Sequence, residues 1–510
     1  MYVGEVLVDS SSRLGEGKRE ELEELQEVFK VPQGWYSVIG QYGNFRVLYL
    51  KEPKILFGQG YKSTLFPRDF RLARKFYTSS IPINVTLKFL YTGRDRLLPQ
   101  FLQSLKLWSE RFNFHVSLEP QLVQSYSELC EEILKALQGA GTRDSKDLTV
   151  GGMLGPATRS ECNNIFERTK AYSLIYRVPT HLINANKFNN IINECVKGEN
   201  ARNVNDPREL EKCKAYESYL LNNVVQLYAK AGGIPWVPEE GMLLKGVVVI
   251  GLSTAKMKSG AGNSYIVGTA FSIAYLGREI RSYAVASLYS DGELDWDFRR
   301  SSGIYIPRRT IRELLSKIRE VHGQPSGFII FQTPVIHPEE IEGVRDVLGY
   351  RNWILVHVKR SGFLKRIYDK STVDWGPYRG ICAVNDDYID TFKDNGVLKA
   401  ILVSTGRARI GNREEALYRA TPKPLELEIR VDVRDAEYYK DPQALASYIS
   451  RIVLLLGKLD WEAFTNWPKV PFVIKYAHRL AKIIATVDTT TKGKILGASN
   501  ISPVSLRFIM

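Results

Sequence analysis

Lys230 is the residue whose type and position best suit anion binding. It lies in the last turn of an expected apolar helix, directly before a glycine pair at 232–233 and an Ile-Pro-Trp run at 234–236. Glycine ends a helix readily because it enters left-handed backbone geometry without steric cost. A lysine there is commonly a partner of the helix dipole. The other interpretation is a charge-assisted hydrogen bond to a phosphate.

The sequence contains few residue patterns that are typical of metal-dependent or nucleophilic catalysis. Acids gather at Asp291, Glu293, Asp295 and Asp297, in a loop whose simplest interpretation is a solvated turn. None of the six histidines lies in a Gly-X-Ser-X-Gly or Cys-His context. The five cysteines form no C-x-x-C pair and have no spaced histidine partners. We therefore expect neither a structural zinc site nor a disulfide framework.

The composition is that of a folded, basic, multidomain protein. A chain of 510 residues is too long for one core, so two or three domains are expected. The formal net charge of +14 favours a polyanionic partner, with nucleic acid first among the candidates. No apolar run reaches the length of a membrane span, and the N-terminus lacks the basic start of a signal peptide. We expect a soluble, cytoplasmic chain that makes no membrane contact itself.

Two successive α/β units must position these side chains. In the first, apolar spacing predicts strands at 83–90 and 172–178, helices at 97–112 and 125–138, and a loop at 139–155. Alternation of this kind indicates a mostly parallel sheet, whose ligands lie beyond the carboxyl ends of the strands. The second unit begins with an antiparallel meander and continues with alternating helices and strands, in the order of a ribonuclease H: 247–252, 264–275, 279–287, 310–321, 328–331, a helix from Pro338, and 353–357.

Several segments resemble Argonaute proteins. The apolar helix, lysine, glycine pair and Pro-Trp of 222–236, followed by the β-branched strand at 247–250, resemble the junction of the MID and PIWI domains. Residues 50–58 resemble the lead into the MID domain, and 437–481 resemble the end of PIWI domains. Because no room remains for separate N and PAZ domains, the chain resembles a short prokaryotic, archaeal-type Argonaute.

This resemblance implies an α/β fold with a Rossmann-like MID domain and a ribonuclease-H-like PIWI domain. The expected boundaries are an N-terminal extension at 1–50, the MID domain at 51–240 and the PIWI domain at 241–510. It also implies a catalytic site for two magnesium ions held by carboxylates. Here Leu252 stands at the first of those positions, and Thr333 and Pro334 replace an Asp-Gly. Only His478 matches, so we expect no cleavage activity.

The resemblance also implies a pocket for the 5′ phosphate of a guide strand. The family uses a Tyr or His and a Lys from one helix, a Gln from the next turn, and a final Lys before the glycine pair. Lys230 matches the final position. Lys187 is the candidate for the first lysine, with an exposed loop lysine as the alternative, and Arg202 or Asn203 stands where the glutamine is expected.

Further residues are assigned by the same resemblance. Lys475, Arg479 and Lys482 could line the guide backbone, or form a solvated face. The carboxylate of Met510, at an apolar end that follows the strand-like 504–506, is the candidate to join a magnesium ion to the 5′ phosphate.

The function implied is guide-directed binding of nucleic acid without cleavage. A 5′-phosphorylated guide RNA would recognise a complementary single-stranded DNA target by base pairing. The expected role is defence against invading nucleic acid, through a separate protein that replaces the missing N-terminal half and a downstream effector. The alternatives are an active guide-directed endonuclease with relocated carboxylates, and a protein that binds nucleic acid without a guide.

Overall fold

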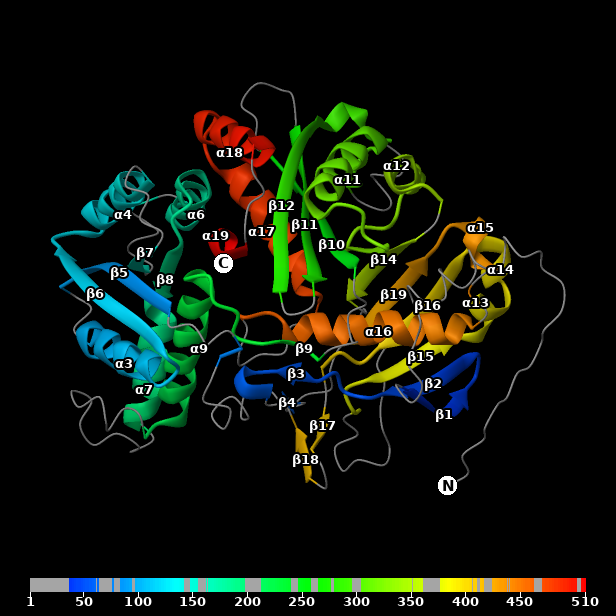
Figure 1. Cartoon of the computed structure of the whole chain (residues 1–510), viewed down its shortest axis with the longest axis horizontal. Helices are drawn as coiled ribbons and strands as arrows, with labels where there is room; N and C mark the ends of the chain where they lie inside the picture. Colours follow the sequence, from blue (N-terminus) through cyan, green and yellow to red (C-terminus); the bar gives the residue numbers. More distant parts are fainter. Residues whose placement is uncertain are drawn as a thin grey trace.

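The computed structural model shows two α/β units that contact each other along the C-terminal helices (Figure 1). The residues it describes are 36–60, 62–63, 76–77, 83–93, 97–141, 147–154, 162, 164–197, 212–239, 246–257, 265–276, 279–295, 304–350, 352–360, 377–405, 407–410, 413–416, 424–437, 439, 441–462, 470–501 and 506–510.

The first unit is a four-stranded parallel sheet between two layers of helices, as expected for a Rossmann-like domain. Its strand order is β6 (Phe114–Val123), β5 (Ile83–Thr92), β7 (Leu148–Leu154) and β8 (Thr180–Asn184). In Figure 1 one layer contains α4 (Tyr126–Gly141) and α6 (Ile165–Tyr176), and the other contains α3 (Leu98–Glu110), α7 (Ala185–Lys197) and α9 (Lys214–Lys230).

Two predictions for this unit were wrong. The segment 172–178, predicted as a strand, is mostly the end of α6, because a short apolar run suits a buried helix as well as a strand. The predicted loop at 139–155 contains β7. Its pair Gly151 and Gly152 suggests a turn, but a Cβ atom at Gly151 would overlap the ring of Phe89, and one at Gly152 would lie 2.6 Å from Ile133. The glycines thus allow close packing on β7.

The second unit contains a ten-stranded sheet with the ribonuclease-H order at its centre. The antiparallel meander is followed by two parallel strands, as predicted. Four more strands extend the sheet beyond β19, and the last two come from the predicted N-terminal extension. The order is β12 (Glu279–Ser290), β11 (Tyr265–Leu276), β10 (Val247–Lys256), β13 (Gly327–Gln332), β14 (Trp353–Arg360), β19 (Leu425–Arg430), β16 (Val397–Leu402), β15 (Ile381–Asn385), β2 (Phe45–Leu50) and β1 (Tyr36–Tyr42).

Alternating side chains of β10 pack against helices on both faces of this sheet. Val248 and Ile250 pack with α11 (Arg308–His322) and α12 (Pro338–Leu348), whereas Val247 and Val249 belong to the core shared with α16 (Pro442–Lys458) and α17 (Phe472–Thr486). A Cβ atom at Gly251 would overlap the main chain of Val473, so α17 lies directly on β10.

The remaining described elements are short, apart from the 13-residue helix α18. They are β3 (Ile55–Leu56), η1 (Gly58–Gly60), β4 (Lys62–Ser63), β9 (Val237–Pro238), η2 (Asp291–Glu293), α13 (Asp386–Asp390), α14 (Phe392–Asn395), β17 (Arg407–Ile410), β18 (Arg413–Ala416), α15 (Val433–Ala436), α18 (Thr489–Ile501) and α19 (Leu506–Ile509).

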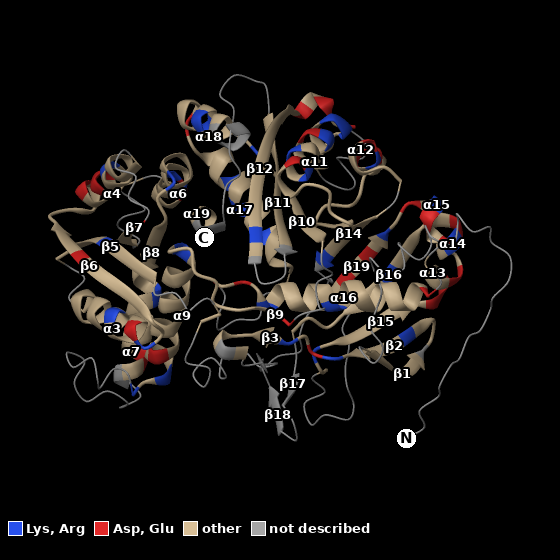
Figure 2. Cartoon of the chain, viewed as in Figure 1, with Lys and Arg blue, Asp and Glu red and all other residues tan. Residues whose placement is uncertain are grey.

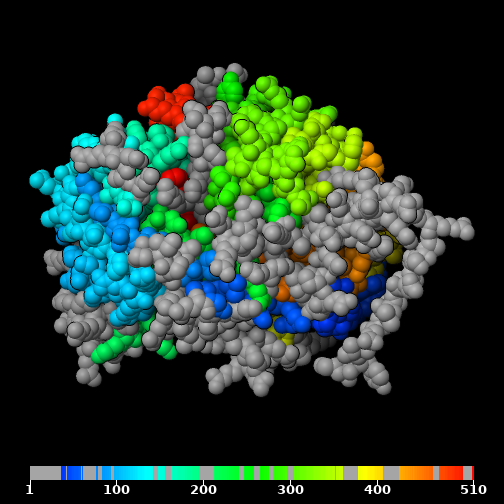
Figure 3. All heavy atoms as spheres, in the orientation of Figure 1, coloured from blue at the N-terminus to red at the C-terminus, as the bar shows by residue number. Residues whose placement is uncertain are grey.

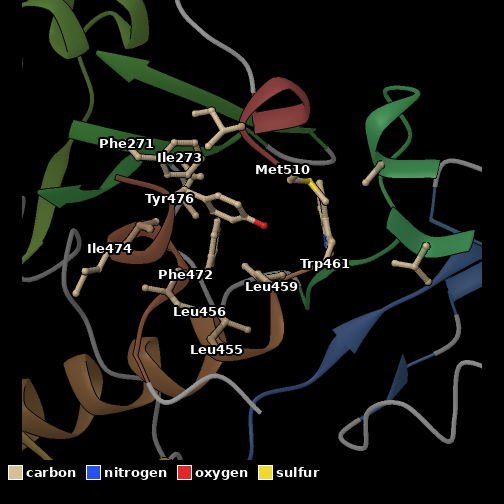
Figure 4. Packing of buried hydrophobic residues seen from close by; sticks show 14 of the residues in the cluster. Phe271, Ile273, Leu455, Leu456, Leu459, Trp461, Phe472, Ile474, Tyr476 and Met510 are labelled. Carbon is tan, nitrogen blue, oxygen red and sulfur yellow. The ribbon is translucent and has the colours of Figure 1, made fainter. Parts of the chain in front are cut away.

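The C-terminal residues return to the junction of the two units. Helix α19 contacts α6 and α9 of the first unit and α17 of the second. Of the expected strand-like segment at 504–506, residues 504 and 505 lie outside the described residues, and Leu506 is the first residue of α19. Met510 is 1% exposed, and it belongs with Trp461 and Tyr476 to one apolar cluster (Figure 4). In Figure 3 only a few red C-terminal atoms are visible between the two units. The end of the chain is therefore packed.

The expectation that the cysteines form no disulfide bonds was wrong. Cys130 is bonded to Cys162, and Cys195 to Cys213, while Cys382 is free and buried. Both bonds lie in the first unit and join residues that are 32 and 18 positions apart. Sequence spacing cannot reveal such pairs, because the Cα atoms approach only through the packing of helices.

Among the described residues, no helix is long and apolar enough to cross a membrane.

Candidate functional site

Three buried basic side chains meet where α6, β8 and α9 approach the C-terminus. Lys170 is on α6, His181 is the second residue of β8, and Lys230 is the last residue of α9; they are 2%, 0% and 3% exposed. Figure 2 shows the blue end of α9 close to the mark of the C-terminus. As predicted, α9 ends at the glycine pair, where Gly232 has a positive φ of 93°. This backbone turn leaves Lys230 at the junction of the two units.

Lys170 links the first unit to the C-terminus. Its ammonium group donates hydrogen bonds to Thr180 Oγ1, at 2.8 Å, and to the main-chain oxygen of Met510. One turn further along α6, Ser173 Oγ lies 3.3 Å from the main-chain oxygen of Phe508. Helix α6 therefore holds residues 508–510 by hydrogen bonds as well as by packing.

His181 joins Lys230 to a second chain of hydrogen bonds. Lys230 Nζ lies 3.5 Å from His181 Nδ1, and His181 Nε2 lies 3.1 Å from Asn223 Oδ1. Asn223 Nδ2 donates to the main-chain oxygen of Tyr219, which leaves Oδ1 as the acceptor. Because Lys230 can only donate, this arrangement requires a neutral His181 with its proton on Nε2.

The second unit contributes a mixed set of charges from α17 and from the residues after α16. Arg479 Nη1 donates to Glu462 Oε1 at 2.5 Å and to the main-chain oxygen of Ile509 at 3.2 Å. Lys475 Nζ lies 3.1 Å from Glu462 Oε2 and 2.7 Å from Asp460 Oδ2. We call Lys170, His181, Lys230, Glu462 and Arg479 the junction cluster.

Burial sets the charge of the junction cluster. Desolvation lowers the pKa of Lys230 to about 8, although Glu462 opposes the shift. Burial, reinforced by the charge of Lys230, holds the pKa values of Lys170 and His181 well below their usual ranges. Burial opposes ionisation of Glu462, but Arg479 and Lys475 outweigh it and hold the pKa of that carboxyl below its usual range. Basic side chains therefore outnumber the acidic side chain of the junction cluster, and a bound anion would favour the protonated forms of the two lysines.

The donor set of the junction cluster suits an anion and does not suit magnesium. Magnesium requires oxygen ligands in octahedral geometry. Here the Met510 oxygen already accepts a hydrogen bond from Lys170, and Arg479 holds the oxygen of Ile509. A divalent cation would compete with these cationic groups for the same oxygens. The predicted magnesium role of Met510 thus does not fit these residues, whereas a direct contact between ammonium groups and a phosphate does.

The other predicted phosphate and backbone residues lie in different surroundings. Lys187 is exposed in the first turn of α7, and its ammonium lies 5.5 Å from the ring centroid of Tyr219. Arg202 and Asn203 lie outside the described residues. Lys482 is exposed and lies 3.3 Å from Glu167 of α6. Of the predicted residues, Lys230, Lys475, Arg479 and Met510 all lie at the junction of the two units.

Sequence reasoning missed Lys170 and His181. The resemblance implied a Tyr or His and a Lys on one helix, a Gln in the next turn and a final Lys before the glycine pair. Lys170 on α6 and His181, which follows residues 177–179, have the chain order of that lysine and that glutamine, with a histidine in place of the glutamine. They were missed because the end of α6 was taken for a strand, which moved the assignment one helix too far along the chain.

The positions of the expected catalytic carboxylates contain no acid. Leu252 is 1% exposed within the apolar cluster between the sheet and α11. At the end of β13, Gln332 Nε2 donates to Glu340 Oε2 at 2.8 Å, and Thr333 is exposed. His478 Nδ1 lies 3.2 Å from Ser253 Oγ, the side chain next to Leu252. Within the described part of the chain, no three His, Cys, Asp or Glu side chains group as metal ligands.

Comparisons with known proteins agree with this architecture. No family model and no curated protein matches the sequence. The chain is similar to the crystal structure of A. aeolicus Argonaute, with 12% identity and a TM-score of 0.50 over 86% of this chain and 53% of that one. It is also similar to Drosophila Piwi, with 13% identity and a TM-score of 0.51 over 91% of this chain and 56% of that one. The chain thus spans about half the length of these proteins, and its fold is the Argonaute and Piwi fold, with a Rossmann-like MID domain and a ribonuclease-H-like PIWI domain.

Proposed function

We propose that this chain binds a 5′-phosphorylated guide strand, with the phosphate in the junction cluster, and uses the guide to recognise a complementary strand without cutting it. The observation that carries the proposal is the meeting of Lys170, Lys230 and Arg479 at the MID–PIWI junction. Buried cations are costly unless an anion neutralises them. A terminal phosphate brings close to two negative charges and three acceptor oxygens.

The absence of cleavage is part of this proposal. Two-metal hydrolysis requires carboxylates that bridge the ions and the scissile phosphate. Leu252 and Thr333 replace two of these groups, and the ring of His478 already has Ser253 as a partner. An assay with a guide, a complementary target and Mg²⁺ or Mn²⁺ should give intact target. Guide-dependent cuts at one fixed position would favour an active endonuclease with relocated carboxylates.

The remainder of the proposal rests on the resemblance to Argonautes. It comprises an RNA guide, a single-stranded DNA target, a role in defence, and a separate protein partner and effector. Sequencing the ends of nucleic acid that copurifies with the protein would test the guide. We expect a narrow length class with 5′ phosphates, whereas a broad mixture would favour guide-independent binding.

The decisive test of the phosphate site is Lys230→Ala. We expect this change to remove about 1.5–3 kcal/mol of binding energy for a 5′-phosphorylated guide, because a charged hydrogen bond is lost. A 5′-hydroxyl guide of the same sequence should lose much less. The matched control is Lys187→Met, which removes an exposed lysine of the same domain and should leave the preference for the phosphate unchanged. Equal losses for both guides with Lys230→Ala would contradict the phosphate role.

A further inference from the structure

Glu462 is an acid inside a cluster that otherwise suits an anion. Its side chain is 12% exposed, and its two oxygens lie 2.5 Å from Arg479 and 3.1 Å from Lys475. Its main-chain oxygen accepts from Gln226 Nε2 at 3.4 Å, and Gln226 lies one turn before Lys230 on α9. The acid is therefore fixed at the end of the helix that carries the pocket lysine.

The position of Glu462 is one that a phosphate oxygen would occupy. Guanidinium groups bind carboxylate and phosphate oxygens with the same geometry. Arg479 Nη1 is shared between Glu462 Oε1 and the Ile509 oxygen, and the neighbouring Met510 oxygen is bound by Lys170. An anion that contacts both Lys170 and Arg479 would lie beside the carboxylate, and such adjacent like charges repel strongly.

From this geometry, and on the basis of the phosphate site proposed above, we propose that Glu462 is a built-in competitor for the guide's 5′ phosphate. In the guide-free protein its carboxylate neutralises Arg479. When the guide binds, its 5′ phosphate replaces the Glu462 carboxylate as the partner of Arg479. The carboxylate then pairs with Lys475 alone.

The surrounding contacts permit this exchange. Lys475 is held by Asp460, whose oxygens lie 2.7 and 2.9 Å from its ammonium group. Asp460 Oδ1 also accepts from the main-chain N–H of Glu462 at 3.2 Å and from the hydroxyl of Tyr476 at 3.2 Å. The main chain and Lys475 thus have anchors that do not depend on Arg479. Only the side chain of Glu462 has to move, and it keeps one cationic partner throughout.

The exchange has a consequence for selectivity. The displaced carboxylate gives up the contact with Arg479, so an incoming group must supply enough charge to replace it. A terminal phosphate with nearly two charges does so, whereas a 5′ hydroxyl cannot. The carboxylate of Glu462 should also keep small anions present in the cell away from Arg479.

The test is Glu462→Gln, which removes the charge and retains the size and an acceptor oxygen. We expect the affinity for a short 5′-phosphorylated RNA to rise about tenfold, since a repelling charge is lost, and the affinity for the same RNA with a 5′ hydroxyl to stay unchanged. Inorganic phosphate should become a stronger competitor. The matched control is Glu313→Gln on α11, which removes an acid paired at 2.7 Å with Lys317 and changes the net charge equally. It should change neither affinity.

Other outcomes would overturn the proposal. A weaker binding of the phosphorylated RNA by Glu462→Gln would show that Glu462 positions Arg479 for the guide. An equal change for both RNAs, or none, would show that it does not compete at the 5′ end. If Glu462→Gln does not fold, Glu462→Asp retains the charge with a shorter reach and should give a smaller rise of the same kind. Should the wild type itself show no preference for a 5′ phosphate, the proposed function fails, and not this step alone.

Discussion

The positions expected to hold catalytic carboxylates and the junction cluster differ in the charge that they bury. At the first, the position of an expected carboxylate is filled by Leu252, within an apolar cluster. At the second, Lys170, Lys230 and Arg479 lie close together, with Glu462 paired to Arg479 and the oxygen of Met510 bound by Lys170. An apolar side chain at a buried position costs nothing, whereas a buried cation has a large desolvation cost. The junction cluster therefore has a large desolvation cost, which the apolar side chain of Leu252 does not have.

This difference indicates which of the two sites requires a bound ligand. The cluster around Leu252 is complete without any further group. In the junction cluster, burial lowers the pKa values of Lys170, His181 and Lys230 and so favours their neutral forms, and a bound anion would oppose that shift. Substitutions at the two sites should therefore affect different properties, namely folding at Leu252 and anion binding at the junction.

The largest effect is expected for Leu252→Asp, which restores a carboxylate without its metal-binding partners. A buried charge with no counter-ion should lower the free energy of unfolding by about 3–5 kcal/mol. Chemical denaturation would measure the loss. The control is Leu252→Met, which conserves volume and should cost less than about 1.5 kcal/mol. If Leu252→Asp is as stable as the wild type, the first site is not a completed apolar core.

The second effect is expected for Lys170→Met, which retains much of the stem of Lys170 and removes its ammonium group. We expect a loss of about 2 kcal/mol in the affinity for a 5′-phosphorylated guide, the value of a charged hydrogen bond. Direct binding titrations with phosphorylated and hydroxyl guides would measure it, with Lys187→Met as the control. A loss in stability without a change in the preference for the phosphate would assign Lys170 to holding residues 508–510 only.

The third effect is the pH dependence of guide binding. Burial lowers the pKa of Lys230 to about 8, and a phosphate favours the protonated lysine, so binding takes up protons when the pH exceeds this value. Affinity for the phosphorylated guide should fall about tenfold between pH 7 and pH 9. Below pH of about 6 it should fall again, as the phosphate loses its second charge. Lys230→Met should flatten the alkaline limb, and a wild-type profile that is flat above pH 8 would contradict this assignment.

The smallest effect, close to none, is expected from a chelator. Because Lys170 and Arg479 already hold the oxygens of Met510 and Ile509, the 5′ phosphate should bind without magnesium. Titrations with EDTA and with added Mg²⁺, at matched ionic strength, should give the same affinity. A large loss with EDTA that Mg²⁺ restores would show that a metal ion takes part at Met510 after all.

Much of the fold was predictable because it depends on local patterns. The strand predicted at 247–252, the following meander and the helix predicted at 310–321 have strong apolar periodicity, and they are observed as β10, β11, β12 and α11. Predictions failed where a short apolar run suited two conformations, as at the end of α6, or where glycines allowed close packing instead of a turn, as in β7.

Of the candidate site, the sequence by itself determined the lysine before the glycine pair, the apolar C-terminal residues and the absence of carboxylates at Leu252 and Thr333. These are properties of single positions and their immediate neighbours. Only the tertiary structure decided that Lys170, His181 and Glu462 share a site with Lys230, although they come from four segments up to 292 positions apart. Their meeting depends on α19 and α17 docking against α6 and α9, and the free energy of that docking comes from buried surface on several elements at once. The pairing of the cysteines depends on packing within the first unit, and the lowered pKa values of the lysines depend on burial at the junction, so no local pattern in the chain could specify either.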